Sequence, residues 1–185
     1  MNDVMIDIET LDTRPTAVIL SIAAVRFDSM TQAPLGESFQ CHVDIDSNLK
    51  WGRTISGSTL LWWLGQDEEA RRSVTDATTI PLGEALHQLR SFIKDTDRVW
   101  SNGASFDVAI LSDAYRAAGT DTPWRFWNDR CYKTLKNLHP EVPKPEFVGV
   151  KHNALDDAKF QAVHTQNIMR KKDLADLGRF SEFKA

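Results

Sequence analysis

Two acidic residues stand one residue apart within an apolar segment near the start of the chain, VMIDIETL at 4–11. Side chains in a β-strand alternate between the two faces of a sheet, so Asp7 and Glu9 are expected on the same face, about 7 Å apart. Two carboxylates in apolar surroundings repel one another and resist desolvation. Water, a basic partner or a metal cation must therefore stabilise them.

A third acidic residue stands where the chain enters a predicted helix, in the segment NGASFDVAIL. Ser105 is the expected N-cap of this helix, and Asp107 falls in its first turn. An acidic residue in a first turn interacts favourably with the helix dipole by about 0.3–1 kcal/mol. A purely structural role is therefore a sufficient explanation for Asp107 when this residue is considered alone.

The segment KHNALDDAKF repeats this arrangement near the end of the chain. Asn153 is the expected N-cap, which leaves Asp156 and Asp157 in the first turn. His152 precedes the cap, and a histidine in a loop can turn back toward the carboxylate of Asp157. Such a pair suits a general base beside a metal ligand, because a histidine side chain can accept a proton near neutral pH. The alternative is a surface histidine without a chemical role.

Together, these motifs resemble those of the DEDDh group of 3′→5′ exonucleases, in the ribonuclease H-like superfamily. The Asp-x-Glu motif of the group is matched by DIE at 7–9, its second motif by NGASFD at 102–107, and its His-x-x-x-x-Asp motif by HNALDD at 152–157. The resemblance extends over residues 4–168. The segment TLLWWLGQDEEARRSV is further similar to the subgroup that contains phage exonuclease A and small bacterial exoribonucleases.

The resemblance also implies a role for each motif residue. It makes metal ligands of Asp7, Glu9, Asp107 and Asp157, and a general base of His152. Oxygen ligands suit Mg²⁺ or Mn²⁺, and two such ions about 3.5–4 Å apart can hold the attacking and leaving oxygens of a phosphodiester. The implied reaction is hydrolysis at the 3′ end of single-stranded DNA or RNA, or of a short oligonucleotide, which releases nucleoside 5′-monophosphates. The metal ions would also stabilise the paired carboxylates of the first motif.

Candidate substrate-binding residues lie close to these motifs or carry aromatic rings: Thr10, Leu11, Trp62, Trp63, Asn102 and Phe106. A base stacked on an aromatic side chain gains about 1–3 kcal/mol without any sequence requirement, which suits a tryptophan to hold a terminal base. Adjacent helical positions point about 100° apart, so at most one of Trp62 and Trp63 is expected to face the substrate. Thr10 and Leu11 resemble positions near the terminal nucleotide in the group, where backbone contact is expected. Core packing is the alternative role for the aromatic residues.

Residue periodicity predicts the elements that must hold these side chains. Strands are expected over residues 4–9, 17–28, 38–46, 98–101 and 130–132, the first three as an antiparallel meander. Helices are expected over 58–74 with a break near Gly65, over 80–94 and 102–119, and from about 154 to 169, whereas the proline-rich segment 139–147 is expected to be a loop. This order predicts an α/β domain, and the resemblance implies a ribonuclease H-like mixed β-sheet flanked by α-helices.

Length and charge limit the class of protein further. The 185 residues suit a single domain, with the motifs within 4–168 and a tail over about 173–185. Apolar stretches are too short to span a membrane and no export signal is present, so a cytoplasmic location is expected. The net charge of −4 argues against a surface that coats nucleic acid non-specifically, but it is compatible with a phosphate substrate bridged by metal ions.

Two other functions remain open at this point. A nucleic-acid-binding or polymerase-binding module could keep the fold without catalysing a reaction, although the presence of all five expected catalytic positions counts against it. A purely structural role for every acidic residue would predict that metal ions do not affect stability. DNA and RNA both remain candidate substrates, and the resemblance makes a homodimer possible.

Overall fold

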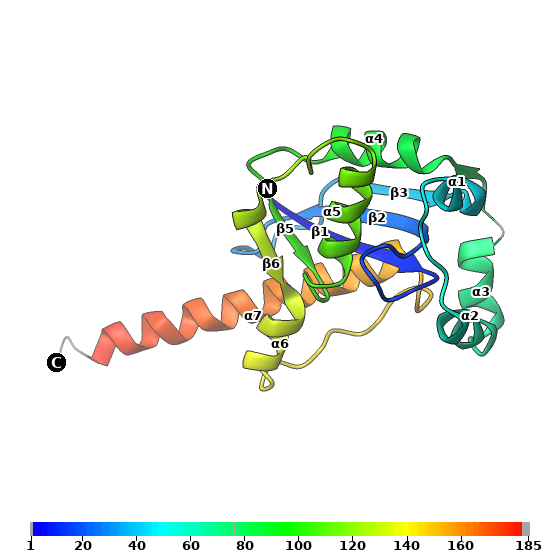
Figure 1. Ribbon diagram of the computed structural model, residues 1–185. Helices are drawn as coiled ribbons and strands as arrows, with labels where there is room; N and C mark the ends of the chain where they lie inside the picture. Colours follow the sequence, from blue (N-terminus) through cyan, green and yellow to red (C-terminus); the bar gives the residue numbers. More distant parts are fainter. Residues whose placement is uncertain (1, 76, 183–185) are drawn as a thin grey trace.

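The computed structural model describes the backbone of residues 2–75 and 77–182 (Figure 1). Within these ranges six strands form one mixed sheet in the order β4-β3-β2-β1-β5-β6. The strands are β1 (Asp3–Thr10), β2 (Ile19–Phe27), β3 (Ser38–Val43), β4 (Thr79–Ile80), β5 (Arg98–Ser101) and β6 (Asp129–Cys131). Antiparallel pairing joins β1 to β2 and β2 to β3, which confirms the predicted meander, whereas β4, β5 and β6 add as parallel neighbours.

Helices cover both faces of this sheet, as Figure 1 shows. They are α1 (Ile45–Lys50), α2 (Gly57–Leu64), α3 (Glu68–Thr75), α4 (Leu82–Phe92), α5 (Asp107–Ala117), α6 (Tyr132–Leu138) and α7 (Ala154–Glu182), with a 3₁₀ turn at Phe126–Asn128. The predicted mixed sheet flanked by α-helices is thus confirmed. Among the described helices, none combines the length and the apolar character needed to cross a bilayer.

The alternation of side chains along β1 determines which face carries the acidic pair. The even-numbered residues of 4–8 pack with α4 and α5 in one apolar core, and Met5 packs with Phe27 and residues of α7 in another. Odd-numbered positions share a face in a strand. Asp7 and Glu9 therefore lie on the Met5 side of the sheet, where α7 crosses β1.

Several element boundaries differ from the predictions for local reasons. The third strand ends at Val43, because Asp44 caps α1 by accepting a hydrogen bond from the amide of Ser47 at 2.7 Å. Ile80, the predicted first residue of a helix, instead pairs with β3 as part of the short strand β4, and α4 begins at Leu82. The predicted break at Gly65 is confirmed, since this residue is the C-cap of α2.

The helices that carry the later motifs also begin or end differently from the prediction. Phe106 is the N-cap of α5 and makes no side-chain capping hydrogen bond, so the expected cap at Ser105 is wrong. Residues 102–106 form turns that place Asp107 at the first helical position. The last helix begins at Ala154 as predicted, but it continues to Glu182 and does not end near residue 169.

Candidate active site

Four carboxylates from three separate segments of the chain meet at the end of β1. Asp7 and Glu9 come from the strand itself, Asp107 opens α5, and Asp157 lies in the first turn of α7. They line a cavity of about 210 Å³ together with Ile8, Asn102, Phe106, His152 and Gln161. The structure therefore places together every residue that the sequence predicted as a metal ligand or a general base.

Three of these carboxylates, those of Asp7, Glu9 and Asp107, are buried, whereas Asp157 is half-buried. Asp7 and Glu9 are each 9% exposed and Asp107 is 3% exposed. Burial raises the pKa of Asp107 to about 7, and burial followed by repulsion between the carboxylates raises the pKa of Asp7 and of Glu9 well above their ordinary values. Among the described residues, no lysine or arginine forms an ion pair with any of the four. A concentration of buried oxygen donors without a protein cation fits hard divalent cations such as Mg²⁺ or Mn²⁺.

The loop before α7 directs His152 toward the acidic residues. His152 has a left-handed backbone conformation, with φ at +64°, and its amide donates a hydrogen bond to Oδ2 of Asp157 at 2.8 Å. One potential ligand atom from each of Glu9, His152 and Asp157 lies within 4.8 Å of the others. Asn153 caps α7 as predicted, since its Oδ1 accepts hydrogen bonds from the amides of residues 155 and 156.

Asp156 lies next to the motif, but its carboxylate faces the loop. Its Oδ2 accepts a hydrogen bond from the amide of Val150 at 2.9 Å. Gly149 makes this contact possible, because a Cβ atom at this position would lie 2.3 Å from Asp156 Oδ2. Its φ of +113° is also a conformation in which any residue type with a side chain would be strained. Asp156 and Gly149 thus hold the loop that presents His152.

The two adjacent tryptophans have different environments, as the helical spacing predicted. The Trp62 side chain is substantially exposed, and its ring centroid lies 4.9 Å from that of His152 in an edge-to-face arrangement. The Trp63 side chain is buried, and its Nε1 donates a hydrogen bond to the carbonyl oxygen of Thr10 at 2.9 Å. Trp62 is therefore the tryptophan whose ring is accessible beside the acidic cavity.

A second cavity of about 390 Å³ borders the acidic one, since Ile8, Glu9 and Phe106 line both. Its lining also includes three of the predicted substrate-binding residues, Thr10, Trp62 and Trp63. Cavities of about 300–1,000 Å³ are typical of small-molecule sites. This cavity has room for a nucleotide next to the carboxylates.

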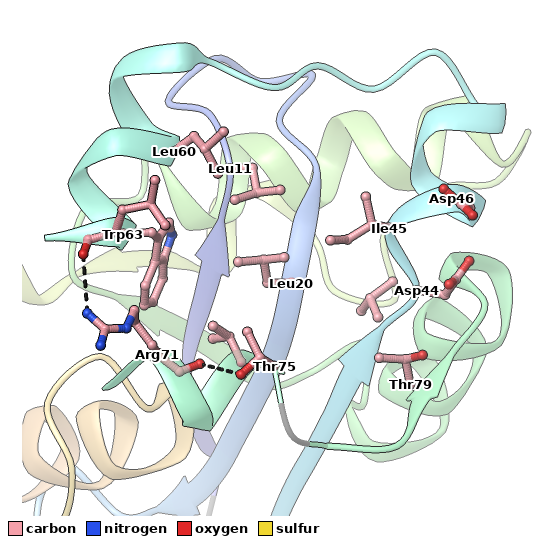
Figure 2. Close-up of a pocket in the computed structure, with 13 residues that line it drawn as sticks. Leu11, Leu20, Asp44, Ile45, Asp46, Leu60, Trp63, Arg71, Thr75 and Thr79 are labelled. Atoms are coloured by element: carbon pink, nitrogen blue, oxygen red, sulfur yellow. Dashed lines mark hydrogen bonds between the residues drawn. The ribbon is translucent and has the colours of Figure 1, made fainter. Parts of the chain in front are cut away.

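Leu11 lies elsewhere. It lines an apolar cavity of about 460 Å³ with Leu20 and Trp63, and Figure 2 shows these side chains facing the same space. Both backbone groups of Leu11 are used within the protein, since its amide donates to Val18 and its carbonyl oxygen accepts from Ser56. The backbone of Leu11 therefore has no free amide hydrogen with which to bind a substrate.

The prediction did not include Gln161, which lines the acidic cavity. Its Nε2 donates a hydrogen bond to Oδ1 of Asp7 at 2.7 Å. Gln161 lies four residues after Asp157, a spacing that places two side chains on the same face of a helix. That spacing is the signal that could have revealed Gln161 in the sequence.

Known proteins share both the sequence pattern and the fold of this chain. Residues 2–169 match the family model of the 3′-5′ exoribonuclease Rv2179c-like domain. An exodeoxyribonuclease of Enterobacteria phage T4 is 26% identical over 165 residues, which cover 72% of this chain and 70% of the phage protein.

Two solved structures have a similar arrangement of strands and helices. The nuclease domain of 3′hExo, a DEDDh family member bound to rAMP, gives a TM-score of 0.60 at 14% identity and covers 91% of each chain. Exonuclease X in complex with 5′-overhanging duplex DNA gives a TM-score of 0.58 at 17% identity, with 92% of each chain covered. These likenesses confirm the predicted ribonuclease H-like fold class.

Proposed function

This chain belongs to the family of 3′-5′ exoribonuclease Rv2179c-like domains and is a DEDDh 3′-5′ exonuclease, and we propose that it removes mononucleotides from single-stranded 3′ ends or short oligonucleotides. The observation that carries this proposal is the meeting of four carboxylates and His152 around one cavity. A binding module without turnover would not require this set of residues.

In this proposal two divalent cations, Mg²⁺ or Mn²⁺, are held by Asp7, Glu9, Asp107 and Asp157. Such ions supply Lewis-acid stabilisation of the charge that develops on phosphodiester oxygens. The burial of Asp7, Glu9 and Asp107, to which no described lysine or arginine forms an ion pair, supports the assignment.

His152 accepts the proton of the attacking water. Its position beside Glu9 and Asp157 supports this role, because a general base must reach the water that loses the proton, and all three residues line the cavity in which that water would lie. The Trp62 ring, edge-on to His152, then offers a stacking surface for the terminal base in the cavity of about 390 Å³. The released product is a nucleoside 5′-monophosphate.

RNA is the first candidate substrate, because the family model describes an exoribonuclease. DNA is the second candidate, because the phage T4 relative is named an exodeoxyribonuclease. Matched 5′-labelled single strands of RNA and DNA, incubated with Mn²⁺ or Mg²⁺, distinguish the two. We expect both ladders to shorten from the 3′ end, with the RNA strand degraded faster.

The control in this assay is Asp7→Ala, which is expected to abolish shortening of either strand. A wild-type protein that cleaves neither strand, yet melts at a higher temperature with Mn²⁺, would support the binding module in place of the exonuclease. Ions that bind the native state alone raise its stability by mass action, so the melt reports binding separately from turnover.

A homodimer is the second part of the proposal. Leu61 and Leu64 on α2 are 70% and 61% exposed, so this helix presents apolar side chains that a second copy of the chain would cover. Sedimentation equilibrium at micromolar concentration tests the homodimer, which should give twice the mass of one chain. A measured mass of one chain would reject it.

A further inference from the structure

A basic cavity lies close to the acidic one, between α6, the proline-rich loop and α7. It has a volume of about 420 Å³, and its described lining includes Lys136, Lys144 and His164 but no aspartate or glutamate. Figure 1 shows α6 beside α7, and the loop after α6 leading back to the start of α7. The cavity thus has the opposite charge character to the acidic cavity.

A hydrogen bond connects the two cavities. Nζ of Lys136 donates to Oδ1 of Asn102 at 3.0 Å. Asn102 lines the acidic cavity and Lys136 lines the basic one. A ligand that extends past Asn102 therefore reaches the Lys136 ammonium directly.

Within the described part of the chain, the lysines of this region have no carboxylate partners. Among the described residues, no ion pair involves Lys133, Lys136 or Lys144. The Lys136 ammonium lies 4.8 Å from the centre of the Tyr132 ring. Its pKa is lowered by burial and then by the positive charges of Lys144 and Lys133. An anion in this cavity would relieve that repulsion, and in a chain of net charge −4 such a cluster provides local attraction for a polyanion.

The walls of the basic cavity are held by buried polar contacts. The Tyr132 hydroxyl lies 2.8 Å from Nδ1 of His164, and Nε2 of His164 lies 3.3 Å from the carbonyl oxygen of Val142. These contacts join α6, α7 and the loop. The cavity is consequently formed before any ligand binds.

We propose that Lys136 and Lys144, with Lys133 beside them, bind the phosphodiester backbone of the substrate strand on the 5′ side of the scissile phosphate. This inference rests on the proposed exonuclease function. The terminal nucleotide occupies the cavity beside Trp62, which borders the acidic residues through Glu9 and Phe106. The rest of the strand then passes Asn102 toward Lys136. The two ends of this path lie on different helices, α2 with Trp62 and α6 with Lys136, and Figure 1 shows these helices well separated. Substrates with several phosphates therefore gain contacts that a single nucleotide ester lacks.

The test compares the hydrolysis of two substrates by the protein of residues 1–185. One is a 5′-labelled single strand of about ten nucleotides, and the other is the p-nitrophenyl ester of thymidine 5′-monophosphate, which contains one phosphodiester. In the Lys136→Gln/Lys144→Gln variant, we expect the ratio of kcat/KM for the strand to that for the ester to fall by about tenfold or more. The slope of log KM against log salt concentration should also fall by about 1.4, since each phosphate contact of a single strand contributes about 0.7.

Two single variants complete the design. Lys144 is exposed, so Lys144→Gln is expected to fold normally and to lower the ratio in the same direction. Lys50→Gln on α1 removes the same charge away from the basic cavity and should leave the ratio unchanged. If Lys136→Gln/Lys144→Gln and Lys144→Gln both keep the kcat/KM ratio and the salt slope of the wild type, this inference is overturned. Failure of the wild-type protein to hydrolyse either substrate would instead refute the proposed function.

Discussion

Gln161 on α7 donates a hydrogen bond from Nε2 to Oδ1 of Asp7 on β1 at 2.7 Å, across 154 residues of sequence. Its side chain is buried, and its Oε1 has no hydrogen-bond partner within the described part of the chain. The contact joins the strand of the first acidic motif to the helix of the last. Asp7 is therefore oriented by a residue that belongs to none of the three motifs.

Replacing Gln161 by leucine should weaken metal binding. Groups that orient a metal ligand typically account for about 10–100-fold in metal affinity. We therefore expect Gln161→Leu to need about ten times more Mn²⁺ than the wild type for the same rise in melting temperature. Gln166→Leu is the matched control, because Gln166 is also buried on α7 but donates to the carbonyl oxygens of Asp28 and Ala33. Equal Mn²⁺ dependence in both variants would show that Gln161 only packs.

Removing the charge of Asp107 should stabilise the metal-free protein at high pH. Its pKa rises from 3.8 to about 7 on folding, so between these values the native state holds a proton that the unfolded chain has released. By linkage, protonation of Asp107 stabilises the native state of the wild type relative to its deprotonated form. This contribution to the free energy of unfolding is fully present below about pH 4 and is lost as the pH rises through 7, an effect on the order of 4 kcal/mol. Asp107→Asn keeps an acceptor for the amide of Ile8.

The measurement is calorimetric melting in EDTA from about pH 4 to pH 8. We expect Asp107→Asn to melt above wild type at pH 8 and the difference to disappear near pH 4. Mn²⁺ should raise the melting temperature of wild type more than that of the variant, because the variant lacks one negative ligand. A wild-type protein as stable as the variant in EDTA at pH 8 would contradict a raised pKa of Asp107 in the folded protein.

Substitution of His152 should separate proton transfer from metal binding. Asparagine tolerates the left-handed backbone found at this position, so His152→Asn should preserve the loop. We expect the cleavage rate to fall by about 10²–10⁴-fold, the usual contribution of a general base, while the Mn²⁺-dependent rise in melting temperature stays. Loss of that rise would identify His152 as a metal ligand and not as the base.

The two tryptophans should respond differently to substitution. Trp62→Ala removes the exposed ring and should raise KM by a factor equivalent to about 1–3 kcal/mol of lost stacking. Trp63→Phe removes the hydrogen bond to Thr10 and should lower the free energy of unfolding by about 1 kcal/mol, with KM unchanged. Steady-state kinetics measure the change in KM, and urea denaturation measures the change in the free energy of unfolding. If KM changes in Trp63→Phe but not in Trp62→Ala, Trp63 and not Trp62 stacks on the terminal base.

Gly149→Ala should destabilise the loop that carries His152. The added Cβ would meet the carboxylate of Asp156 at 2.3 Å, and the φ of +113° is unfavourable for alanine. We expect a loss of at least about 1–3 kcal/mol in the free energy of unfolding, measured in urea. Gly57→Ala in α2 is the control, because no atom lies within 4 Å of the added Cβ, and it should be neutral. A neutral Gly149→Ala would show that the loop can rearrange freely.

Local pattern was sufficient for much of the fold. The meander, the break at Gly65 and the first residue of α7 all follow from the types and spacing of neighbouring residues. Strand β4 and the cap of α5 were mispredicted, because two residues pair as a strand only through a distant partner, and because the turn at 102–106 replaced a side-chain cap.

The sequence by itself determined that Asp7 and Glu9 share one face of a strand, since side chains in a strand alternate with a period of two. Only the tertiary structure decided what surrounds them. The contact of Gln161 with Asp7, the hydrogen bond from Lys136 to Asn102 and the separate cavity of Leu11 join segments far apart in the chain. Periodicity describes neighbours along one element, whereas these contacts depend on how separate elements pack against one another.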